Sequence, residues 1–260
     1  MPRFFVQRGQ IENDTVTLTG DDAHHLSRSL RMAVGERITV CDMQKTEYEC
    51  ELEAFLPDRV LARVLTAVPS DTEPPYLAEV YQALPKGDKL DSIIQKSVEC
   101  GASRIQPFES ERCVVRVKDA ASEAKKTERR ARIATEAAKQ CGRGSLPEVL
   151  PTCSIDEAIA RAAKAGLALF CYEGDEVEPL PAVLRRYRAD LVKKTDFLPR
   201  ISIMIGSEGG FSRAELERAK AAGMHPIGLG KRILRTETAA SFVLACLVYE
   251  LELGDAGVEA

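Results

Sequence analysis

The sequence predicts an α/β protein in which a small β-rich unit precedes a larger domain with a mainly parallel sheet. From residue 76 onward, short apolar segments alternate with amphipathic segments of helical period, which is the element order of an α/β domain. Residues 201–205 read Ile-Ser-Ile-Met-Ile, a composition typical of a parallel strand that is covered on both faces. Residues 47–54 alternate glutamate with Tyr, Cys, Leu and Ala, which indicates a half-buried antiparallel strand.

The composition is that of a globular protein, because the 260 residues are 45% hydrophobic and 29% charged. The eight cysteines form no C-x-x-C pair and there are only three histidines, so we expect free thiols and no metal site. No signal peptide is recognisable, and the longest apolar run, 239–249, is shorter than the ~20 residues that span a bilayer. We therefore expect a cytoplasmic protein without a membrane partner. With a net charge of −4, any nucleic acid must be bound by a local basic surface.

Residues 1–70 are expected to form one unit with a helix and several short strands. The helix covers residues 21–35, with Asp21 or Asp22 as its cap and Gly35 as its end. Its apolar face carries Leu26, Leu30 and Val34, and its basic face carries His24, Arg28 and Arg31. Strands are expected at 38–41, 47–54 and 60–68, and so many short strands favour a small β-barrel. Residues 71–75 are the expected linker to a domain at 76–260.

Within residues 76–260 the expected elements follow one another as βα units. Strands are expected at 77–84, 104–108, 167–172, 201–205 and 226–229. Helices are expected at 88–100, 127–141, 154–166, 212–223 and 236–251. Two of these helices begin with Ser-x-x-Glu, at Ser154 and Ser212, which is the signature of a capping box.

Two loops near the C-terminus carry the residue types of a ligand site. The first, Gly-Ser-Glu-Gly-Gly at 206–210, lies between a strand and a helix, where open α/β sheets bind ligands. Glycine allows positive φ angles and a close approach to the main chain, and the helix start offers free N–H groups. The loop has neither the P-loop nor the G-x-G-x-x-G pattern, so by itself it also fits a tight turn without a ligand.

The second loop, 228–239, places charged residues between glycines and an apolar helix. Thr236 stands where it can act as the N-cap of that helix. Arg235 follows an apolar pair, where an unpaired charge is unfavourable. We therefore expect Arg235 to have an anionic partner, which is Glu237, Glu208 or a ligand.

Four segments carry a resemblance to a known family. They are residues 26–32, Gln-Cys-Gly-Arg at 140–143, the loop at 206–210, and Leu-Gly-Lys-Arg-Ile-Leu-Arg-Thr-Glu-Thr-Ala at 229–239. Together they resemble the ribosomal small-subunit (16S) RNA uridine-N3 methyltransferase family of the SPOUT superfamily, over nearly the whole chain. The chain departs from that family at Ser207 and Lys231, where proline is usual and would stiffen the loops. Residues 185–197 are expanded, and no function is assigned to them.

The resemblance implies a PUA-like β-barrel domain, then a SPOUT-type parallel sheet with a C-terminal trefoil knot, although protein chains by default do not knot. The implied activity is methylation of N3 of one uridine in 16S ribosomal RNA, with S-adenosyl-L-methionine as cofactor. The implied cofactor-binding residues are Phe170, Tyr172, Ile205, Gly206, Glu208, Gly209, Gly210, Leu229, Gly230, Ile233, Leu234, Thr238 and Ala239. The superfamily works as homodimers, and the helix at 236–251 either contributes to that interface or is an ordinary core helix.

The implied reaction also assigns catalytic and RNA-binding residues. N3 of uridine is protonated at neutral pH, so transfer needs proximity, a proton acceptor and a positive group for the developing anion. The motif position assigns these tasks to Arg235, Thr236 and Glu237, with Arg235 stabilising charge and Glu237 orienting Arg235 or accepting the proton. The expected RNA contacts are Arg3, His24, Arg28, Arg31 and Arg143. A second basic cluster at 125–132 contains glutamates and is more typical of a solvated helix face.

Two other functions stay open from the sequence. One is an RNA-binding dimer that does not methylate. The other is a methyltransferase with a different acceptor, such as transfer RNA or a ribose 2′-hydroxyl, as found elsewhere in the superfamily. The N-terminal barrel and the Leu-Arg-Thr-Glu-Thr run at 234–238 favour the uridine base of small-subunit RNA.

Overall fold

The computed structural model describes residues 1–191 and 198–253. The chain divides into two compact units, of which the first holds Met1–Glu73 and Ala138–Leu146. The second holds Pro74–Ala137 and Pro147–Ala260. The sequence did not indicate the return of residues 138–146 to the first unit.

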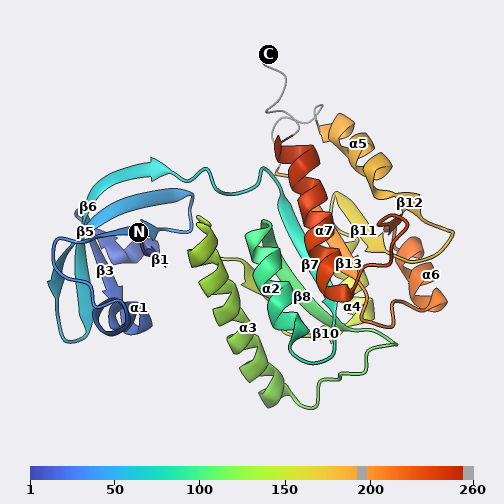
Figure 1. The fold of residues 1–260 in the computed structure, drawn as a ribbon, viewed down its shortest axis with the longest axis horizontal. Helices are drawn as coiled ribbons and strands as arrows, with labels where there is room; N and C mark the ends of the chain where they lie inside the picture. The colour runs from blue at the N-terminus through green and yellow to red at the C-terminus, as the bar shows by residue number, and fades with distance from the viewer. Residues whose placement is uncertain (192–197, 254–260) are drawn as a thin grey trace. The chain divides into compact units, whose positions relative to one another are not determined.

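The first unit is built on one six-stranded sheet with the order β1-β4-β5-β6-β3-β2 (Figure 1). Its strands are β1 (Arg3–Phe5), β2 (Ile11–Glu12), β3 (Thr15–Thr19), β4 (Arg37–Cys41), β5 (Thr46–Phe55) and β6 (Arg59–Pro69), with a 3₁₀ turn, η1, at Arg8–Gln10. All pairs are antiparallel except β1 with β4. Alternate residues of β5 face the core, where Cys50 and Leu52 are fully buried, as the glutamate alternation predicts.

The helix predicted at residues 21–35 is shorter than expected. It consists of α1 (Gly20–His24) and a π-helical turn, η2 (His25–Ser29). Arg31 then takes a left-handed conformation with φ of 52°, which stops the helix. Leu26 packs in the core, but Leu30 and Val34 lie beyond the helix and are exposed, so the predicted apolar face was wrong. Arg31 for the same reason does not share a helix face with His24 and Arg28.

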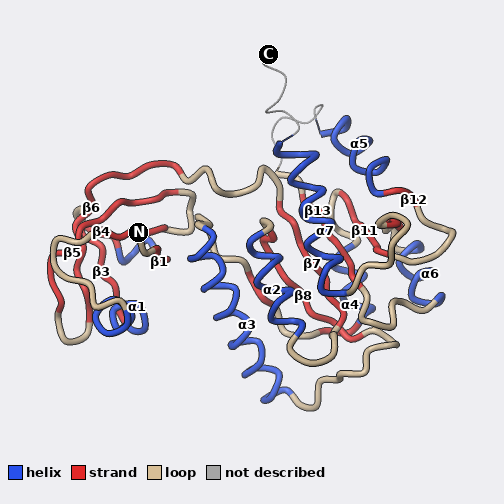
Figure 2. Tube along the Cα trace, in the orientation of Figure 1, coloured by secondary structure: helices blue, strands red, loops and turns tan. Residues whose placement is uncertain are grey.

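The second unit holds an eight-stranded sheet in which every pair of strands is parallel. The order is β10-β8-β7-β13-β11-β14-β12, with β9 paired to β8. The strands are β7 (Leu77–Ala83), β8 (Ala102–Glu109), β9 (Glu148–Val149), β10 (Cys153–Ser154), β11 (Leu167–Cys171), β12 (Glu178–Pro179), β13 (Arg200–Ile205) and β14 (His225–Gly228). The predicted α/β class with a parallel sheet is confirmed by the strand pairing, and Figure 2 shows the strands of this sheet among the helices of the unit.

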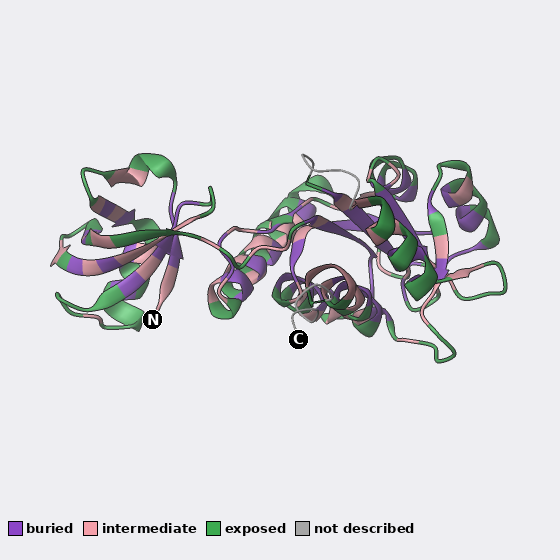
Figure 3. Ribbon diagram, turned by 90° about the horizontal axis from the view of Figure 1, so that it is seen from above, coloured by how far each residue is buried: buried purple, intermediate pink, exposed green. Residues whose placement is uncertain are grey.

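The helices of the second unit connect these strands. They are α2 (Lys89–Glu99), α3 (Ala120–Cys141), α4 (Ile155–Ala162), α5 (Leu180–Leu191), α6 (Arg213–Ala221) and α7 (Thr236–Val248), followed by a π-helical turn, η3 (Tyr249–Leu253). The last turn of α3 belongs to the first unit. Helices α2 and α7 pack against each other, and α4 packs against β7, β8 and β13. The strand β13 is buried along nearly its whole length, as its apolar composition predicts. Figure 3 shows that buried residues lie along the strands of the sheets and that exposed residues lie mainly on helices and loops.

Both predicted capping boxes are confirmed. Ser154 Oγ accepts from the Glu157 N–H and Ser212 Oγ accepts from the Glu215 N–H, each at 3.3 Å, and each glutamate returns the bond to the serine N–H. Some helix bounds differ from prediction: α3 begins at Ala120, α4 already ends at Ala162, and α5 was not predicted. Helix α5 contains the first part of the expanded segment 185–197, whereas residues 192–197 lie outside the described residues.

Candidate active site

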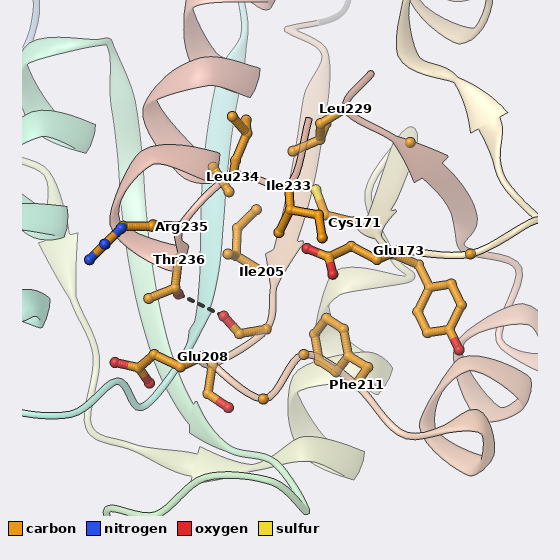
Figure 4. Close-up of a pocket in the computed structure, with 18 of the residues that line it drawn as sticks. Cys171, Glu173, Ile205, Glu208, Phe211, Leu229, Ile233, Leu234, Arg235 and Thr236 are labelled. Atoms are coloured by element: carbon orange, nitrogen blue, oxygen red, sulfur yellow. Dashed lines mark hydrogen bonds between the residues drawn. The ribbon is translucent and has the colours of Figure 1, made fainter. Parts of the chain in front are cut away.

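A cavity of about 630 Å³ lies beyond the carboxyl ends of three neighbouring strands in the second unit. Its walls come from the end of β11 with the loop that follows (residues 171–177), from the end of β13 with its loop (205–211), and from the segment 228–239, which runs from the end of β14 into α7 (Figure 4). This is the position at which open α/β sheets bind ligands, and the volume is within the range of about 300–1,000 Å³ of small-molecule sites. The two loops singled out from the sequence therefore form walls of the same cavity.

The loop at 206–210 is a tight turn that requires its glycines. The Gly210 N–H donates to the Ser207 carbonyl at 2.9 Å, and Gly210 has a φ of 63°. A Cβ atom on Gly206 would lie 3.1 Å from the Gly210 backbone, and one on Gly209 would lie 3.0 Å from Arg112 Cβ. A side chain at either of these two positions would therefore require its neighbours to move by a few tenths of an ångström.

Residues 111–112, about a hundred positions earlier in the sequence, hold the loop at 206–210 in place. Arg112 Nη1 donates to the Gly209 carbonyl at 2.9 Å, and Ser207 Oγ donates to the Arg112 carbonyl at 3.4 Å. The buried Glu215 carboxylate accepts from the Glu111 N–H at 2.7 Å and so fixes the same segment to the start of α6. Ser207 thus supplies a hydrogen bond at the position where the resembled family usually has a stiffening proline.

Aromatic packing supports one side of the cavity. Phe211 lines it, and its ring lies 4.2 Å from the Phe170 ring and 6.3 Å from the Phe108 ring. Phe170 itself is fully buried and does not line the cavity, in contrast to its predicted position. The reason is its place in the strand: Phe170 lies inside β11 and packs against Phe211, whereas Cys171 ends the strand, Tyr172 follows it, and both line the cavity.

Thr236 joins the two glycine loops. Its hydroxyl donates to the Gly206 carbonyl at 2.7 Å, the dashed bond in Figure 4, and accepts from Gln82 Nε2 at 2.9 Å. The expected N-cap role of Thr236 was wrong, because the extended Arg235 is the capping residue and Thr236 is the first residue of α7. Gln82 is fully buried in β7, so the bond ties both loops to the centre of the sheet.

Replacing Thr236 with valine is expected to lower kcat of the methyl transfer that the resemblance implies by about tenfold. Valine keeps the shape of the side chain but loses both buried hydrogen bonds of the hydroxyl. Thr236→Ser keeps the hydroxyl and should stay close to wild type. Parallel kinetics of both variants are the measurement. A loss in the serine variant with wild-type kcat in the valine variant would show that the methyl group of Thr236, and not its hydroxyl, matters.

Arg235 and Glu237 lie at the rim of the cavity. The Arg235 side chain is 82% exposed, points away from the cavity centre in Figure 4, and approaches Glu237 Oε1 only to 4.0 Å. The expected anionic partner of Arg235 is therefore present in Glu237, but the contact is long and solvent hydrates much of the guanidinium group. Of the three partners considered, Glu237 is the one that it meets, and Glu208 pairs with Lys89 instead.

Glu208 is held by two donors from the segment that begins α2. Lys89 Nζ lies 2.8 Å from Glu208 Oε1, and the Lys86 N–H donates to the same oxygen at 3.1 Å. Burial opposes ionisation, but these hydrogen bonds outweigh it and hold the pKa of Glu208 below its ordinary value. Glu208 is therefore ionised at neutral pH and adds negative charge to the rim.

Most of the predicted cofactor residues come together in this cavity. All of them line it except Phe170 and Thr238, as do Arg235, Thr236 and Glu237. The cavity is also lined by Lys89, Arg112, Gly174, Val177 and Phe211, which were not predicted from the sequence. Lys89 had a usable signal, because it follows the end of a predicted strand of the same sheet. Arg112 had none, because its approach to residues 207–209 depends on the strand order.

The predicted RNA-binding residues are divided between exposed and paired positions. His24, Arg28 and Arg31 are exposed, and no described acidic side chain pairs with either arginine. Arg3 pairs with Glu47 at 2.7 Å and is 14% exposed. Arg143 is 5% exposed and forms a two-pronged ion pair with Glu73, at 2.8 and 2.6 Å.

Arg3 and Arg143 therefore have partners within the first unit that the sequence analysis did not foresee. In the cluster at 125–132, Arg129, Arg130 and Arg132 also pair with acidic side chains, namely Asp91, Glu123 and Glu128. Arg130 is buried, so this cluster is only in part a solvated face.

Comparisons with known proteins identify the class of protein to which this fold belongs. Residues 72–248 match the family model of an RNA methyltransferase domain, and residues 18–65 match that of an RNA methyltransferase PUA domain. The two matches define the protein class as an RNA methyltransferase that carries a PUA domain. Within the described residues, no helix is long and apolar enough to cross a membrane.

Individual relatives identify the family within this class of RNA methyltransferases. The chain is 35% identical over 256 residues to the ribosomal RNA small subunit methyltransferase E of Bacillus subtilis, covering 97% of this chain and 98% of that protein. A solved structure of a ribosomal RNA small subunit methyltransferase E from Neisseria gonorrhoeae, bound to S-adenosyl methionine, is 31% identical with a TM-score of 0.77. It aligns over 96% of this chain and 97% of its own. The chain belongs to the ribosomal RNA small subunit methyltransferase E family.

A second solved structure is similar over almost the same length. It is a methyltransferase from Legionella pneumophila in complex with the bound cofactor SAM, 29% identical with a TM-score of 0.80, and it aligns over 95% of this chain and 96% of its own. The overall fold is therefore shared with proteins whose structures contain this cofactor.

Proposed function

We propose that the protein transfers the methyl group of S-adenosylmethionine to N3 of one uridine in 16S ribosomal RNA. The observation that carries this proposal is the cavity formed by the two glycine loops, with a cation and a carboxylate, Arg235 and Glu237, at its rim. Family membership supports the choice of reaction, and the cofactor in the Neisseria relative supports the choice of methyl donor.

The cavity has the features that S-adenosylmethionine requires. Gly206 and Gly209 leave the main chain bare, so a flat adenine ring and a ribose can approach its N–H and C=O groups closely. Leu229, Ile233 and Leu234 supply an apolar wall on the opposite loop (Figure 4). When bound, this cofactor supplies an electrophilic methyl group on a sulfonium sulfur.

The residues at the rim match the needs of the acceptor. Uridine N3 becomes nucleophilic only when its proton leaves, and a carboxylate within hydrogen-bond reach can accept that proton. Glu237 is the proton acceptor in this proposal. The Arg235 side chain is largely exposed, so it can fold over the base and stabilise the negative charge that develops on the carbonyl oxygens of the base. Thr236 lies between these two residues, and its hydrogen bond to the Gly206 carbonyl holds the start of α7 against the loop at 206–210.

The first unit holds the RNA in this proposal, through Arg28 and Arg31. Charge reversal in the Arg28→Glu/Arg31→Glu double variant is expected to weaken RNA binding. It should also reduce the slope of log K against log salt by roughly one and a half, the contribution of two phosphate contacts. Binding isotherms at several salt concentrations provide the measurement, and Arg37→Glu/Arg59→Glu on the same unit is the control. A slope equal to that of wild type would contradict the proposed footprint.

Three finer features are part of the same proposal. The active form is a homodimer with α7 at the interface, and it acts on small ribosomal subunits in the cytoplasm. The loops around the cofactor form a trefoil knot. The strand order supports the knot, because the chain passes from β13 beyond β11 to β14 and then returns through α7 to β13.

Calorimetric titration with S-adenosylmethionine separates this function from that of an RNA-binding dimer that does not methylate. We expect saturable binding with a stoichiometry of one cofactor per chain. Absence of binding at millimolar cofactor would contradict the enzyme function and favour the binding dimer. Transfer to a ribose hydroxyl or to transfer RNA would instead appear in the identity of the methylated nucleoside.

A further inference from the structure

Lys89 connects two carboxylates that come from different parts of the chain. Its Nζ atom lies 2.8 Å from Glu208 Oε1 and 3.6 Å from Glu237 Oε2. Lys89 is the first residue of α2, Glu208 belongs to the loop after β13, and Glu237 lies in the first turn of α7. One ammonium group thus bridges three segments, and all three side chains line the cavity.

The three side chains are held in place by their surroundings. Helices α2 and α7 pack against each other, which keeps the start of α2 beside the start of α7. The Lys86 N–H fixes the Glu208 carboxylate from the other side at 3.1 Å. Lys89 and Glu237 are 34% and 23% exposed, so both are partly shielded and their attraction is screened less than that of a surface pair.

The Glu237 carboxylate has an oxygen without a donor. Its Oε2 atom is buried and has no hydrogen-bond partner among the described residues, because Lys89 at 3.6 Å is too distant for a hydrogen bond. A buried carboxylate oxygen that lacks a donor is unfavourable unless another group supplies one. The Lys89 ammonium group, 3.6 Å away, is the positive charge that offsets part of this cost.

We infer that Lys89 is a positioning residue that holds the Glu237 carboxylate at the rim from the side of its buried Oε2 atom, so that the other oxygen, Oε1, is presented to the N–H group of the methyl acceptor. This inference rests on the proposed function. The N3–H bond breaks and its proton goes to Glu237, while the electron pair stays on N3. That pair forms the bond to the methyl carbon as the carbon–sulfur bond breaks with its pair on sulfur. Lys89 touches neither the base nor the methyl group and acts through Glu237.

The test compares Lys89→Met with Lys89→Arg and with the control Lys96→Met, an exposed lysine on the same helix. Lys89→Met is expected to lower kcat by about 30-fold or more, with KM for RNA and the calorimetric affinity for S-adenosylmethionine each within about threefold. Lys89→Arg should recover most of kcat, because it keeps a cation at the bridge. Lys96→Met should match wild type. In the Glu237→Gln background, Lys89→Met should cause little further loss.

A kcat of Lys89→Met equal to wild type would overturn the inference. So would a loss that appears only as weaker cofactor binding, since Lys89 would then act on the cofactor loop alone. Thermal unfolding gives a second readout that needs no reaction. The Tm losses of Lys89→Met and Glu237→Gln should be less than additive in the double variant, and strict additivity would overturn the bridge. If wild type transfers no methyl group but the Tm coupling is present, the proposed function fails and the Lys89–Glu237 bridge stands.

Discussion

Arg235→Ala is expected to lower kcat for methyl transfer by about 10²–10³-fold, the typical effect of removing one group that stabilises a developing anion. Affinity for S-adenosylmethionine should change by less than about threefold, because the guanidinium group is 82% exposed and points away from the cavity centre (Figure 4). Single-turnover kinetics and calorimetry on the same preparation separate the two effects.

Two further variants sharpen this prediction. Arg235→Lys keeps the charge but not the planar fork, so it should recover only part of the rate. Arg185→Ala removes an exposed arginine on α5, away from the cavity, and should behave as wild type. Wild-type activity in Arg235→Ala would remove Arg235 from the mechanism. A loss of cofactor affinity equal to the loss of rate would instead make it a binding residue.

Gly206→Ala is expected to weaken binding of S-adenosylmethionine by at least about tenfold, which corresponds to about 1.4 kcal/mol. The new Cβ atom would lie 3.1 Å from both backbone carbons of Gly210 and 3.3 Å from the Phe211 ring. The turn must then shift, and it carries with it the carbonyl group that Thr236 binds. Calorimetric titration of the folded variant, with its Tm recorded, measures the effect.

The matched control for this substitution is Gly9→Ala. A Cβ on Gly9 meets nothing within 4 Å, and its φ is not in the left-handed region, so alanine there should leave cofactor affinity unchanged. If Gly206→Ala bound S-adenosylmethionine as tightly as wild type, the turn would tolerate the Cβ atom. The shape of the cavity wall would then not depend on this glycine.

Much of the second unit could be predicted because its signals are local. The Ser-x-x-Glu pattern specifies a capping box within four residues, and both boxes form as predicted. The apolar run at 201–205 specifies a buried parallel strand, and a glycine-rich turn after such a strand indicates a ligand loop. Each of these inferences requires only neighbouring residues, so no knowledge of the tertiary structure was needed.

The predictions that failed depend on distant partners or on backbone geometry. Arg143 carries the same charge as Arg28, and nothing in the sequence shows that Glu73 will form an ion pair with Arg143 and not with Arg28. The left-handed Arg31 ends the first helix early, although the i, i+4, i+8 spacing of apolar residues continues to Val34. Lys89 reaches Glu208 and Glu237 only because β7 and β13 are adjacent in the sheet and α2 packs on α7. Strand order is a tertiary property, and the local patterns of a single sequence do not predict it.

The central claim is that this cavity and its rim methylate N3 of a uridine in small-subunit RNA. Its most direct test is labelled methyl transfer to assembled small subunits and to naked 16S RNA, followed by digestion and mass identification of the modified nucleoside. The expected result is a single product, 3-methyluridine, that requires S-adenosylmethionine and disappears in Arg235→Ala. Label on a ribose 2′-hydroxyl, on a different base, or only on transfer RNA would contradict the account.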